Sequence, residues 1–585
     1  MRSNLGLLAA ARQATPTEPN TPTMSAMLLN SPAVVLEIDL TAQFPDQAFD
    51  PLSRWAYGGQ LTPRAMIEAL RRASRDDNVQ GLIAQVGTTP LGLAEIQELR
   101  EAILLFSRSG KPTVAWAESF GELTPALPSY YLATAFDQIW LQPSGVLGLE
   151  GLTLAVPFVR SALDKLGLEP RFHQRFEYKN AADSLTRTGF TDAHREAATG
   201  VLESVADQLV DGIAATRDLT PAQFRGLMDQ SPVGAHRAEE AGLVDHVGFR
   251  DEAYTTVMAE LTSEGGSEPN RMLLGRYSPN AMGKATRSAT GLIRRDKRDV
   301  GLLQLSGSVR QGHVKAWPPS SDIASTTVVS ALNRIAQDDG LGALVVHIDS
   351  PGGSYVASDA IWHAIGRVRE SGRPVVASMG NTAASGGYFI SMAADKIVAA
   401  PATITGSIGV FAGKVLINGL LDKVGVDVGD VGVGRRAFMS SPRHDYDEDQ
   451  EQALSQWLDE VYWDFVAKVS QSRGMSTDAV HEVARGRIWT GQQALQHGLV
   501  DQLGGTHLAL NTARTLAGLP RSARVREVAL SSPWRALRGA HNADDLAAGT
   551  ASWTTAWGPF ADVAARLGLL GTGPLALPWQ ARDIR

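Results

Sequence analysis

A serine in the second half of the chain lies in a sequence context suited to acyl transfer. Ser385 stands in Ala-Ala-Ser-Gly-Gly-Tyr, between an apolar run typical of a buried strand and a predicted helix over 389–398. A hydroxyl at such a turn can attack a carbonyl. The N–H of Gly386 can stabilise the oxyanion, because N–H groups at a helix start have no intrahelical partner. The same residues are also typical of a plain helix cap, so both interpretations stay open at this point.

A second loop in the same half supplies further backbone donors. Gly352 and Gly353 lie in Asp-Ser-Pro-Gly-Gly-Ser, directly after the apolar run Ala-Leu-Val-Val-His-Ile. Paired glycines after a strand present their N–H groups with no side chain in the way. We therefore expect Gly352, Gly353 and Gly386 to line an oxyanion site beside Ser385.

The chain contains an internal repeat, and only one copy carries these loops. Five segments of the first half recur in the same order in the second half, at offsets of 256 to 262 residues. Ser-Gly-Lys-Pro-Thr-Val-Ala at 109–115 matches Ser-Gly-Arg-Pro-Val-Val-Ala at 371–377, and Leu-Asp-Lys-Leu-Gly at 163–167 matches Leu-Asp-Lys-Val-Gly at 421–425. Ordered matches with a slowly drifting offset indicate a duplicated domain.

Positions at which the two copies differ point to chemistry, because both copies need the same residues merely to fold. At an offset of 258, Ser385 matches Leu127 and Gly386 matches Pro128. The glycine pair after the strand is also absent from the first half, which reads Gly-Thr-Thr-Pro-Leu there. The candidate nucleophile and both candidate oxyanion loops therefore belong to the second half alone.

The candidate base lies in the other half. The first histidine after Ser385 is His444, 59 residues further on in a polar loop. Lys179 of the first half matches Arg436 of the second, and arginine does not deprotonate in proteins. A lysine base must be neutral, so burial must lower its pKa well below about 10.4. Lys179 is therefore either a general base or, as most lysines are, a solvated surface charge.

The repeats are predicted to have an α/β architecture. Short β-branched runs typical of buried strands alternate with amphipathic segments, including predicted helices over 357–369 and 449–473. The predicted organisation is a disordered or weakly targeting N-terminus at 1–30, a first repeat at 31–261, a basic linker at 262–299, a second repeat at 300–530 and a C-terminal extension at 531–585.

Composition excludes several classes of function. The 585 residues carry a formal net charge of −8 and contain no cysteine, which removes disulfides, thiol nucleophiles, iron–sulfur clusters and cysteine zinc sites. The mild acidity argues against a nucleic-acid partner. No apolar stretch is long enough to predict a helix that crosses a bilayer. No phosphate-binding loop motif occurs, and we expect neither a metal nor a nucleotide cofactor.

Four motifs resemble the signal peptide peptidase A (protease IV) family in its long two-repeat form. They are Asp-Ser-Pro-Gly-Gly-Ser at 349–354, Asn-Thr-Ala-Ala-Ser-Gly-Gly-Tyr at 381–388, Thr-Gly-Ser-Ile-Gly-Val at 405–410 and Phe-Glu-Tyr-Lys at 176–179. The resemblance implies tandem crotonase/Clp-protease-like ββα spiral domains and a serine–lysine dyad built across the repeats. It assigns Ser385 as nucleophile, Lys179 as general base, Ser407 as the hydroxyl that orients the lysine, and Gly353 and Gly386 as oxyanion donors.

The resemblance also implies cleaved signal peptides and other unfolded apolar peptides as substrates, a homotetramer, and association with a membrane. Long-form relatives usually begin with a membrane-anchoring helix, which this chain lacks, so we expect it to be cytoplasmic or peripheral to a membrane. Two alternatives remain open: an acyl-CoA enzyme of the crotonase type, which would need neither Ser385 nor Lys179, and a catalytically silent peptide-binding scaffold.

Overall fold

The computed structural model describes residues 33–42, 44, 61–122, 124–262, 268–277, 298–313 and 322–530. The predictions for residues 1–30 and 531–585 lie outside the described residues.

Two sheets with the same strand order form the two halves of the molecule. In the first half the order is β8-β4-β3-β2-β1-β9, and in the second half the matching path is β19-β15-β14-β13-β10-β20. All pairs along both paths are parallel. In the second half β14 also pairs with β16, and β16 pairs antiparallel with β18. The repeated strand order shows that the duplication seen in the sequence is a duplication of the fold.

The strands of the first half are β1 (Val34–Asp39), β2 (Val79–Gln85), β3 (Thr113–Ala117), β4 (Gln138–Leu141), β5 (Val146–Leu147), β6 (Glu169–Gln174), β7 (Val233–Gly234), β8 (His246–Val247) and β9 (Asn270–Leu273). Those of the second half are β10 (Asp299–Ser306), β11 (Val309–Arg310), β12 (Ile323–Ala324), β13 (Leu341–Ser350), β14 (Val375–Ala384), β15 (Lys396–Ala399), β16 (Ile404–Gly406), β17 (Phe411–Leu416), β18 (Ile488–Thr490), β19 (Gln502–Leu503) and β20 (Val525–Glu527).

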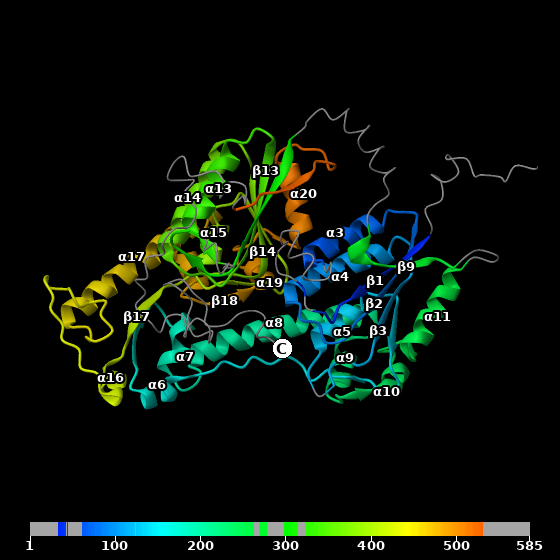
Figure 1. Cartoon of the computed structure of the whole chain (residues 1–585), viewed down its shortest axis with the longest axis horizontal. Coiled ribbons are helices and arrows are strands. Elements are labelled where there is room, and N and C mark those ends of the chain that lie inside the picture. Colours follow the sequence, from blue (N-terminus) through cyan, green and yellow to red (C-terminus); the bar gives the residue numbers. More distant parts are fainter. Residues whose placement is uncertain are drawn as a thin grey trace, which may run out of the picture.

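Helices connect the strands and cover the sheets (Figure 1). The first half has α3 (Pro63–Ala73), α4 (Leu93–Ser107), α5 (Leu127–Ala133), α6 (Arg160–Leu166), η1 (Asn180–Ala182), α7 (Asp183–Thr186), α8 (Asp192–Thr216), α9 (Pro221–Met228), α10 (Ala235–Glu240), α11 (Arg250–Leu261) and η2 (Leu274–Arg276). The second half has α13 (Ser325–Ala336), α14 (Tyr355–Glu370), α15 (Gly386–Ser391), α16 (Asn418–Val424), α17 (Glu448–Arg473), α18 (Thr477–Val483), α19 (Gly491–Gln496) and α20 (Thr506–Leu516).

Most sequence expectations for these elements are confirmed, and two are corrected. The predicted helices over 357–369 and 449–473 lie within α14 and α17. The helix predicted over 389–398 is wrong in its second half, because α15 ends at Ser391 and β15 occupies 396–399. Part of the predicted linker at 262–299 also belongs to the first sheet. Its residues 270–273 form β9, which pairs with β1 as β20 pairs with β10 in the second half.

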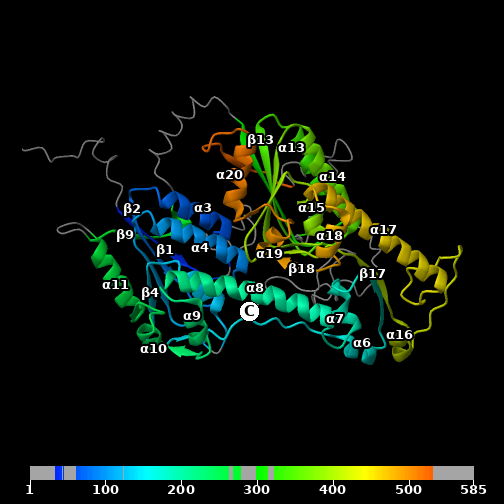
Figure 2. The ribbon, with the colours of Figure 1, turned by 180° about the vertical axis from the view of Figure 1, so that it is seen from behind.

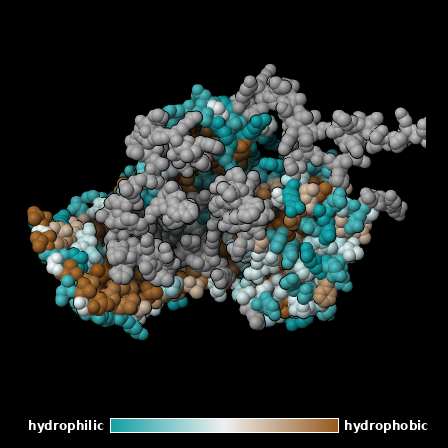
Figure 3. Space-filling view, viewed as in Figure 1, coloured by the Kyte–Doolittle hydropathy of each residue, from teal (hydrophilic) through white to brown (hydrophobic). Residues whose placement is uncertain are grey.

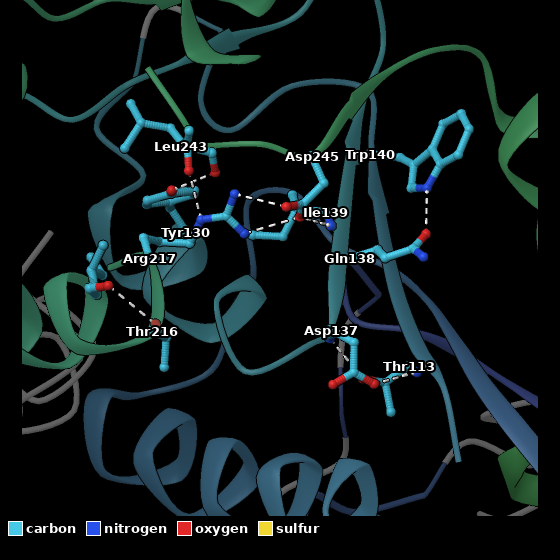
Figure 4. Close-up of polar contacts among 12 residues, drawn as sticks. Thr113, Tyr130, Asp137, Gln138, Ile139, Trp140, Thr216, Arg217, Leu243 and Asp245 are labelled. Carbon is cyan, nitrogen blue, oxygen red and sulfur yellow. Dashed lines mark hydrogen bonds and ion pairs between the residues drawn. The ribbon is translucent and has the colours of Figure 1, made fainter. Parts of the chain in front are cut away.

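A polar cluster common to both repeats holds the end of each sheet together. In the first half the hydroxyl of Tyr130 donates to the carbonyl of Leu243, and Arg217 donates two hydrogen bonds to Asp245 (Figure 4). In the second half the hydroxyl of Tyr388 likewise donates to the carbonyl of Leu499, and Arg473 donates one hydrogen bond to Asp501. Residues that serve the fold are thus retained in both copies, which supports the use of differences between the copies to find the site.

The two repeats interlock through helix α8. It starts beside α7 and runs beneath β18 and α19 of the second half, as Figures 1 and 2 show from opposite sides. The Ser204 hydroxyl lies 2.8 Å from that of Thr490, and Gln493 of the second half donates to the carbonyl of Gly200. Apolar residues of the second half, among them Ile404 and Ile488, also join the core of the first half, so the interface between the repeats is both apolar and polar.

One end of the molecule exposes apolar side chains. Figure 3 shows hydrophobic residues gathered where α6 and α16 lie. Val431 and Val433, in the loop after α16, are each 98% exposed, and Leu166 of α6 is 51% exposed. Among the residues that the structure describes, no helix is both long and apolar enough to cross a membrane.

Candidate active site

Ser385 occupies a sharp turn between β14 and α15. Its backbone has φ 55° and ψ −114°, a positive φ that is uncommon outside glycine and costs about 1–3 kcal/mol. The surrounding hydrogen bonds hold this conformation: its N–H donates to Gly406 O at 2.8 Å, and its C=O accepts from Phe389 N at 2.9 Å. The side chain is fully buried. The turn presents the hydroxyl at the end of the strand and not along its face.

The side chain of Lys179 reaches this hydroxyl from the first repeat. Its Nζ lies 2.8 Å from Ser385 Oγ, 3.0 Å from Ser407 Oγ and 3.2 Å from Ser407 O. Lys179 is 1% exposed, and burial lowers the pKa of its amine from 10.5 to about 7. About half of the amines are therefore neutral at pH 7, and a neutral amine can accept a hydrogen bond from a serine hydroxyl.

Ser407 is the third member of this polar cluster. It follows β16, has φ 52°, and donates its backbone N–H to Arg487 O at 2.7 Å. Its hydroxyl and carbonyl both face the Lys179 amine, so the lysine has two oxygen partners besides Ser385. The structure thus brings together the three side chains that the sequence analysis named for the reaction.

Strand pairing between the repeats places the lysine. β6 of the first repeat pairs antiparallel with β17 of the second, from Glu169 opposite Leu416 to Gln174 opposite Phe411. The pairing continues as Arg175 N donates to Val410 O at 3.0 Å, three residues after Ser407. Lys179 follows four residues further on, so its backbone is anchored to the second repeat.

Two glycines make room for the lysine stem. A Cβ on Gly486, which has φ 87°, would lie within 2.6 Å of the backbone and Cβ of Lys179, and a Cβ on Gly409 would lie 3.2 Å from its Cδ. The sequence analysis did not find these glycines. A signal existed for one of them, because at an offset of 256 Gly486 matches Gln230, so only the second repeat has the glycine.

The two glycine loops meet beside Ser385. A Cβ placed on Gly386 would lie 3.1 Å from the backbone nitrogen of Gly353, so these two residues are in close contact. Gly353 has φ 150° and bridges Val309 of β11, whose carbonyl oxygen would lie 2.1 Å from an added Cβ. The N–H of Gly352 donates to Ser350 Oγ at 3.2 Å. Of the glycine pair, Gly353 therefore presents its nitrogen toward the start of α15, while Gly352 serves the loop itself.

The other candidate base and the repeat matches of the reactive residues lie outside this cluster. His444 pairs with Asp430 at 2.8 Å in the loop between α16 and α17. Arg436, the match of Lys179, binds Asp449 at the start of α17. Leu127, the match of Ser385, is fully buried, and so is Leu149, which matches Ser407 at the same offset of 258.

The duplicated parallel α/β fold defines a class of protein, that with repeated Clp-protease-like domains. The family model for Clp proteases matches residues 305–404, which contain both glycine loops and Ser385. The model for peptidase family S49 matches residues 106–263 and 367–520, one segment in each repeat. The chain belongs to peptidase family S49 and is a serine protease of its protease 4 branch, with Clp-protease-like domains repeated twice.

Relatives of known name agree with this assignment. The chain is 29% identical over 500 residues to the serine protease SPPA of Arabidopsis thaliana, a chloroplastic protein, covering 85% of this chain and 71% of the relative. It is 28% identical over 465 residues to protease 4 of Salmonella typhi, covering 78% and 72%. A putative signal peptide peptidase SppA of Enterococcus faecium is 37% identical over 186 residues, covering 32% of this chain and 54% of the relative.

Proposed function

We propose that the chain is an endopeptidase that cleaves its substrates with a dyad of Ser385 and Lys179. The observation that carries this proposal is the 2.8 Å contact between Lys179 Nζ and Ser385 Oγ, made by an amine whose pKa burial lowers to about 7. A separation of about 2.6–3.2 Å suits direct proton transfer between a nucleophile and its base.

The proposed reaction is acyl transfer in two steps. Neutral Lys179 takes the proton of Ser385, whose oxygen attacks the scissile carbonyl, and the protonated lysine then gives its proton to the leaving amine. Lys179 next activates a water molecule that hydrolyses the acyl-enzyme. Ser407 keeps the amine directed at Ser385 through its hydroxyl and carbonyl. Neither step needs a metal ion or a nucleotide.

The oxyanion of each tetrahedral intermediate is proposed to bind the N–H groups of Gly353 and Gly386. Gly386 begins α15, and the first N–H groups of a helix have no intrahelical partner. The close contact between the two glycines lets both nitrogens face one oxygen. Donors that are fixed in this way stabilise charge as it develops, which is often the largest single contribution to catalysis.

The proposed substrates are cleaved signal peptides and other unfolded apolar peptides. The name of the Enterococcus relative and the family resemblance support this substrate class. The burial of the reactive hydroxyl also supports it, because an extended segment enters a narrow site more easily than a folded surface.

The test uses activity together with covalent labelling. Ser385→Ala and Lys179→Arg are expected to lose turnover of an unfolded apolar peptide by a factor on the order of 10⁴ or more. A fluorophosphonate probe should label the wild-type chain at Ser385. Ser391→Ala, which removes another buried hydroxyl at the end of α15, the helix that Ser385 precedes, is the matched control and should stay active.

Two results would overturn the proposal. Full turnover by Ser385→Ala would indicate chemistry of the crotonase type, in which glycine N–H groups hold an oxyanion without a nucleophile. Wild-type protein that binds apolar peptides but neither cleaves them nor reacts with the probe would be a silent scaffold.

We also propose that the chain forms a homotetramer, which the family resemblance implies. At an offset of 258, Val431 of the second repeat lies in the segment that matches β6 of the first, and Val433 directly follows that segment. β6 is paired with β17 within the chain, whereas this segment exposes its apolar side chains at the end of the molecule. Contact with a second copy would cover them. Val431→Asp together with Val433→Asp should give a smaller particle in analytical ultracentrifugation, and an unchanged mass would contradict the proposal.

A further inference from the structure

A polar cluster on the far side of Lys179 joins the two repeats. Tyr178, the residue before the lysine, donates its hydroxyl to Glu196 Oε2 of α8 at 2.9 Å. Arg487 of the second repeat donates to Glu196 Oε1 at 2.7 Å and to the Tyr178 hydroxyl at 3.3 Å. The guanidinium also lies over the Tyr178 ring, 4.9 Å from its centroid. Arg487 is thus held by a charge, a hydroxyl and a ring of the first repeat.

The backbone of the same arginine contacts the reactive cluster. Arg487 O accepts the N–H of Ser407 at 2.7 Å, and Ser407 in turn faces the Lys179 amine. The preceding residue, Gly486, packs against the backbone of Lys179 and donates its N–H to Ile408 O at 2.8 Å. One short segment therefore contacts both ends of Lys179, with its main chain on the amine side and its side chain on the Tyr178 side.

These contacts occur only around the reactive centre. At an offset of 256 the first repeat has Ser231 in place of Arg487, and the second has Gln452 in place of Glu196. The Tyr–Arg–Asp cluster that holds the sheet ends is present in both copies, so contacts that serve the fold were retained twice. The contact of Arg487 with Tyr178 and Glu196 is present in one copy only, next to the lysine. A role in placing the lysine explains this better than a role in the fold does.

We propose that Arg487 is a positioning residue, which aligns the Lys179 amine with Ser385 by clamping Tyr178 and Glu196 of the first repeat to the segment that carries Ser407. The proposal rests on the dyad mechanism above and adds the contact that fixes the base. Arg487 does not touch the reacting atoms, so it acts through Tyr178 and Ser407.

The chemistry of arginine fits this role better than that of lysine. A planar guanidinium donates in several fixed directions while it stacks on an aromatic ring, whereas an ammonium has three rotating donors and no plane that could stack. The ion pair with Glu196 has little value for stability, because the carboxylate side is 55% exposed and such pairs contribute about 0–1 kcal/mol. An effect of Arg487 on catalysis larger than its effect on stability would therefore reflect alignment.

The experiment compares kcat, KM and their pH dependence in Arg487→Ala and the wild-type chain. Misplacement of a base by about 1 Å costs on the order of 100-fold. We expect kcat to fall 10- to 100-fold with KM within about twofold, since the serine and oxyanion loops stay in place. The acid limb of kcat against pH should also move to higher pH, because water admitted beside the amine lessens its desolvation. Among the described residues no carboxylate bonds to the amine, whose hydrogen-bond partners are Ser385 and Ser407, and the charged groups around Tyr178 are Glu177, Arg485, Glu196 and Arg487.

Arg225→Ala is the matched control. Arg225 pairs with Asp207, which lies on α8 as Glu196 does, but the pair lies within the first repeat. This variant should keep the wild-type kcat and pH profile. Arg487→Lys should recover only part of the activity, and the double variant with Tyr178→Phe should lose less than the product of the single losses, because both act through one contact.

The outcomes separate this inference from the dyad itself. The positioning role alone would be overturned if Arg487→Ala kept the wild-type kcat and the wild-type acid limb while Ser385→Ala was inactive. Activity in Ser385→Ala would instead overturn the dyad. If Arg487→Ala does not fold, Arg487→Lys and Tyr178→Phe test the positioning role instead. Wild-type kcat in both of these variants would refute it.

Discussion

Replacement of Lys179 by methionine should abolish activity and at the same time remove a pH-dependent cost to stability. The folded chain lowers the pKa of this amine to about 7, whereas the unfolded chain has the ordinary value of 10.5. Between these values the unfolded chain binds a proton that the folded chain has released. The unfolding free energy of the wild type therefore rises with pH from about 7 upward, and the penalty is largest below pH 7.

The size of the effect follows from the two pKa values. The full shift corresponds to about 5 kcal/mol at about 1.4 kcal/mol per unit. Integration between pH 7 and pH 9 gives a wild-type gain of about 2 kcal/mol, which Lys179→Met cannot show because it has no proton to release. Methionine also deprives the hydroxyls of Ser385 and Ser407 of the amine, but that loss is the same at each pH.

Urea unfolding at pH 7, 8 and 9 measures this difference. The unfolding free energy of the wild type minus that of Lys179→Met should increase by about 2 kcal/mol across the range, with unchanged m-values. Lys165→Met, which removes an exposed lysine of α6, is the control and should parallel the wild type. A difference between wild type and Lys179→Met that stays constant from pH 7 to pH 9 would refute the claim that the amine is buried with a lowered pKa.

Three further changes test other parts of the site and its support. Ser407→Ala removes the 3.0 Å contact between its hydroxyl and the Lys179 amine but leaves the contact between its carbonyl and that amine. We therefore expect kcat to fall about tenfold with an unchanged melting temperature. Wild-type kcat in this variant would contradict the orienting role of Ser407. Gly386→Ala would press on the Ser358 hydroxyl and on the nitrogen of Gly353, and steady-state kinetics should show kcat lowered on the order of 100-fold with KM little changed. Asn381→Ala removes the side chain of the second repeat that caps α4 of the first at 3.1 Å, and should lower the unfolding free energy by about 1 kcal/mol in urea titrations; no loss would show that the cap is dispensable.

Much of the fold was predictable because the chain is duplicated. The apolar run at 81–86 lies in β2 except for its last residue, the run at 343–349 lies in β13, and their shared place in the strand order follows from their shared place in the repeat. The error after Ser391 has a simple cause. Apart from Asp395 and Lys396 the residues from the short helix into β15 are mostly apolar, and hydrophobicity alone does not mark where the helix ends and the strand begins.

The reactive residues were predictable for a different reason. Ser385 and Lys179 stand where the two copies disagree, so comparison within one chain indicated both. The contact of Tyr178 with Arg487 was not predictable, because the two residues lie 309 positions apart and Arg487 stands in none of the four motifs. Gly486 was missed likewise, since the need for a glycine arises only when the backbone of Lys179 packs against it.

The division of the reactive groups between the repeats explains why the interface is so extensively hydrogen-bonded. Within one sheet, the position of a serine follows from the register of its own strand. A base on another domain has no such constraint, and a shift of about 1 Å between the domains would separate it from the hydroxyl. β6 and β17, the Asn381 cap of α4 and the contacts of α8 each oppose such a shift. Loss of the serine from one copy and the lysine from the other thus left one centre, whose geometry depends on the fit between the copies and not on either core alone.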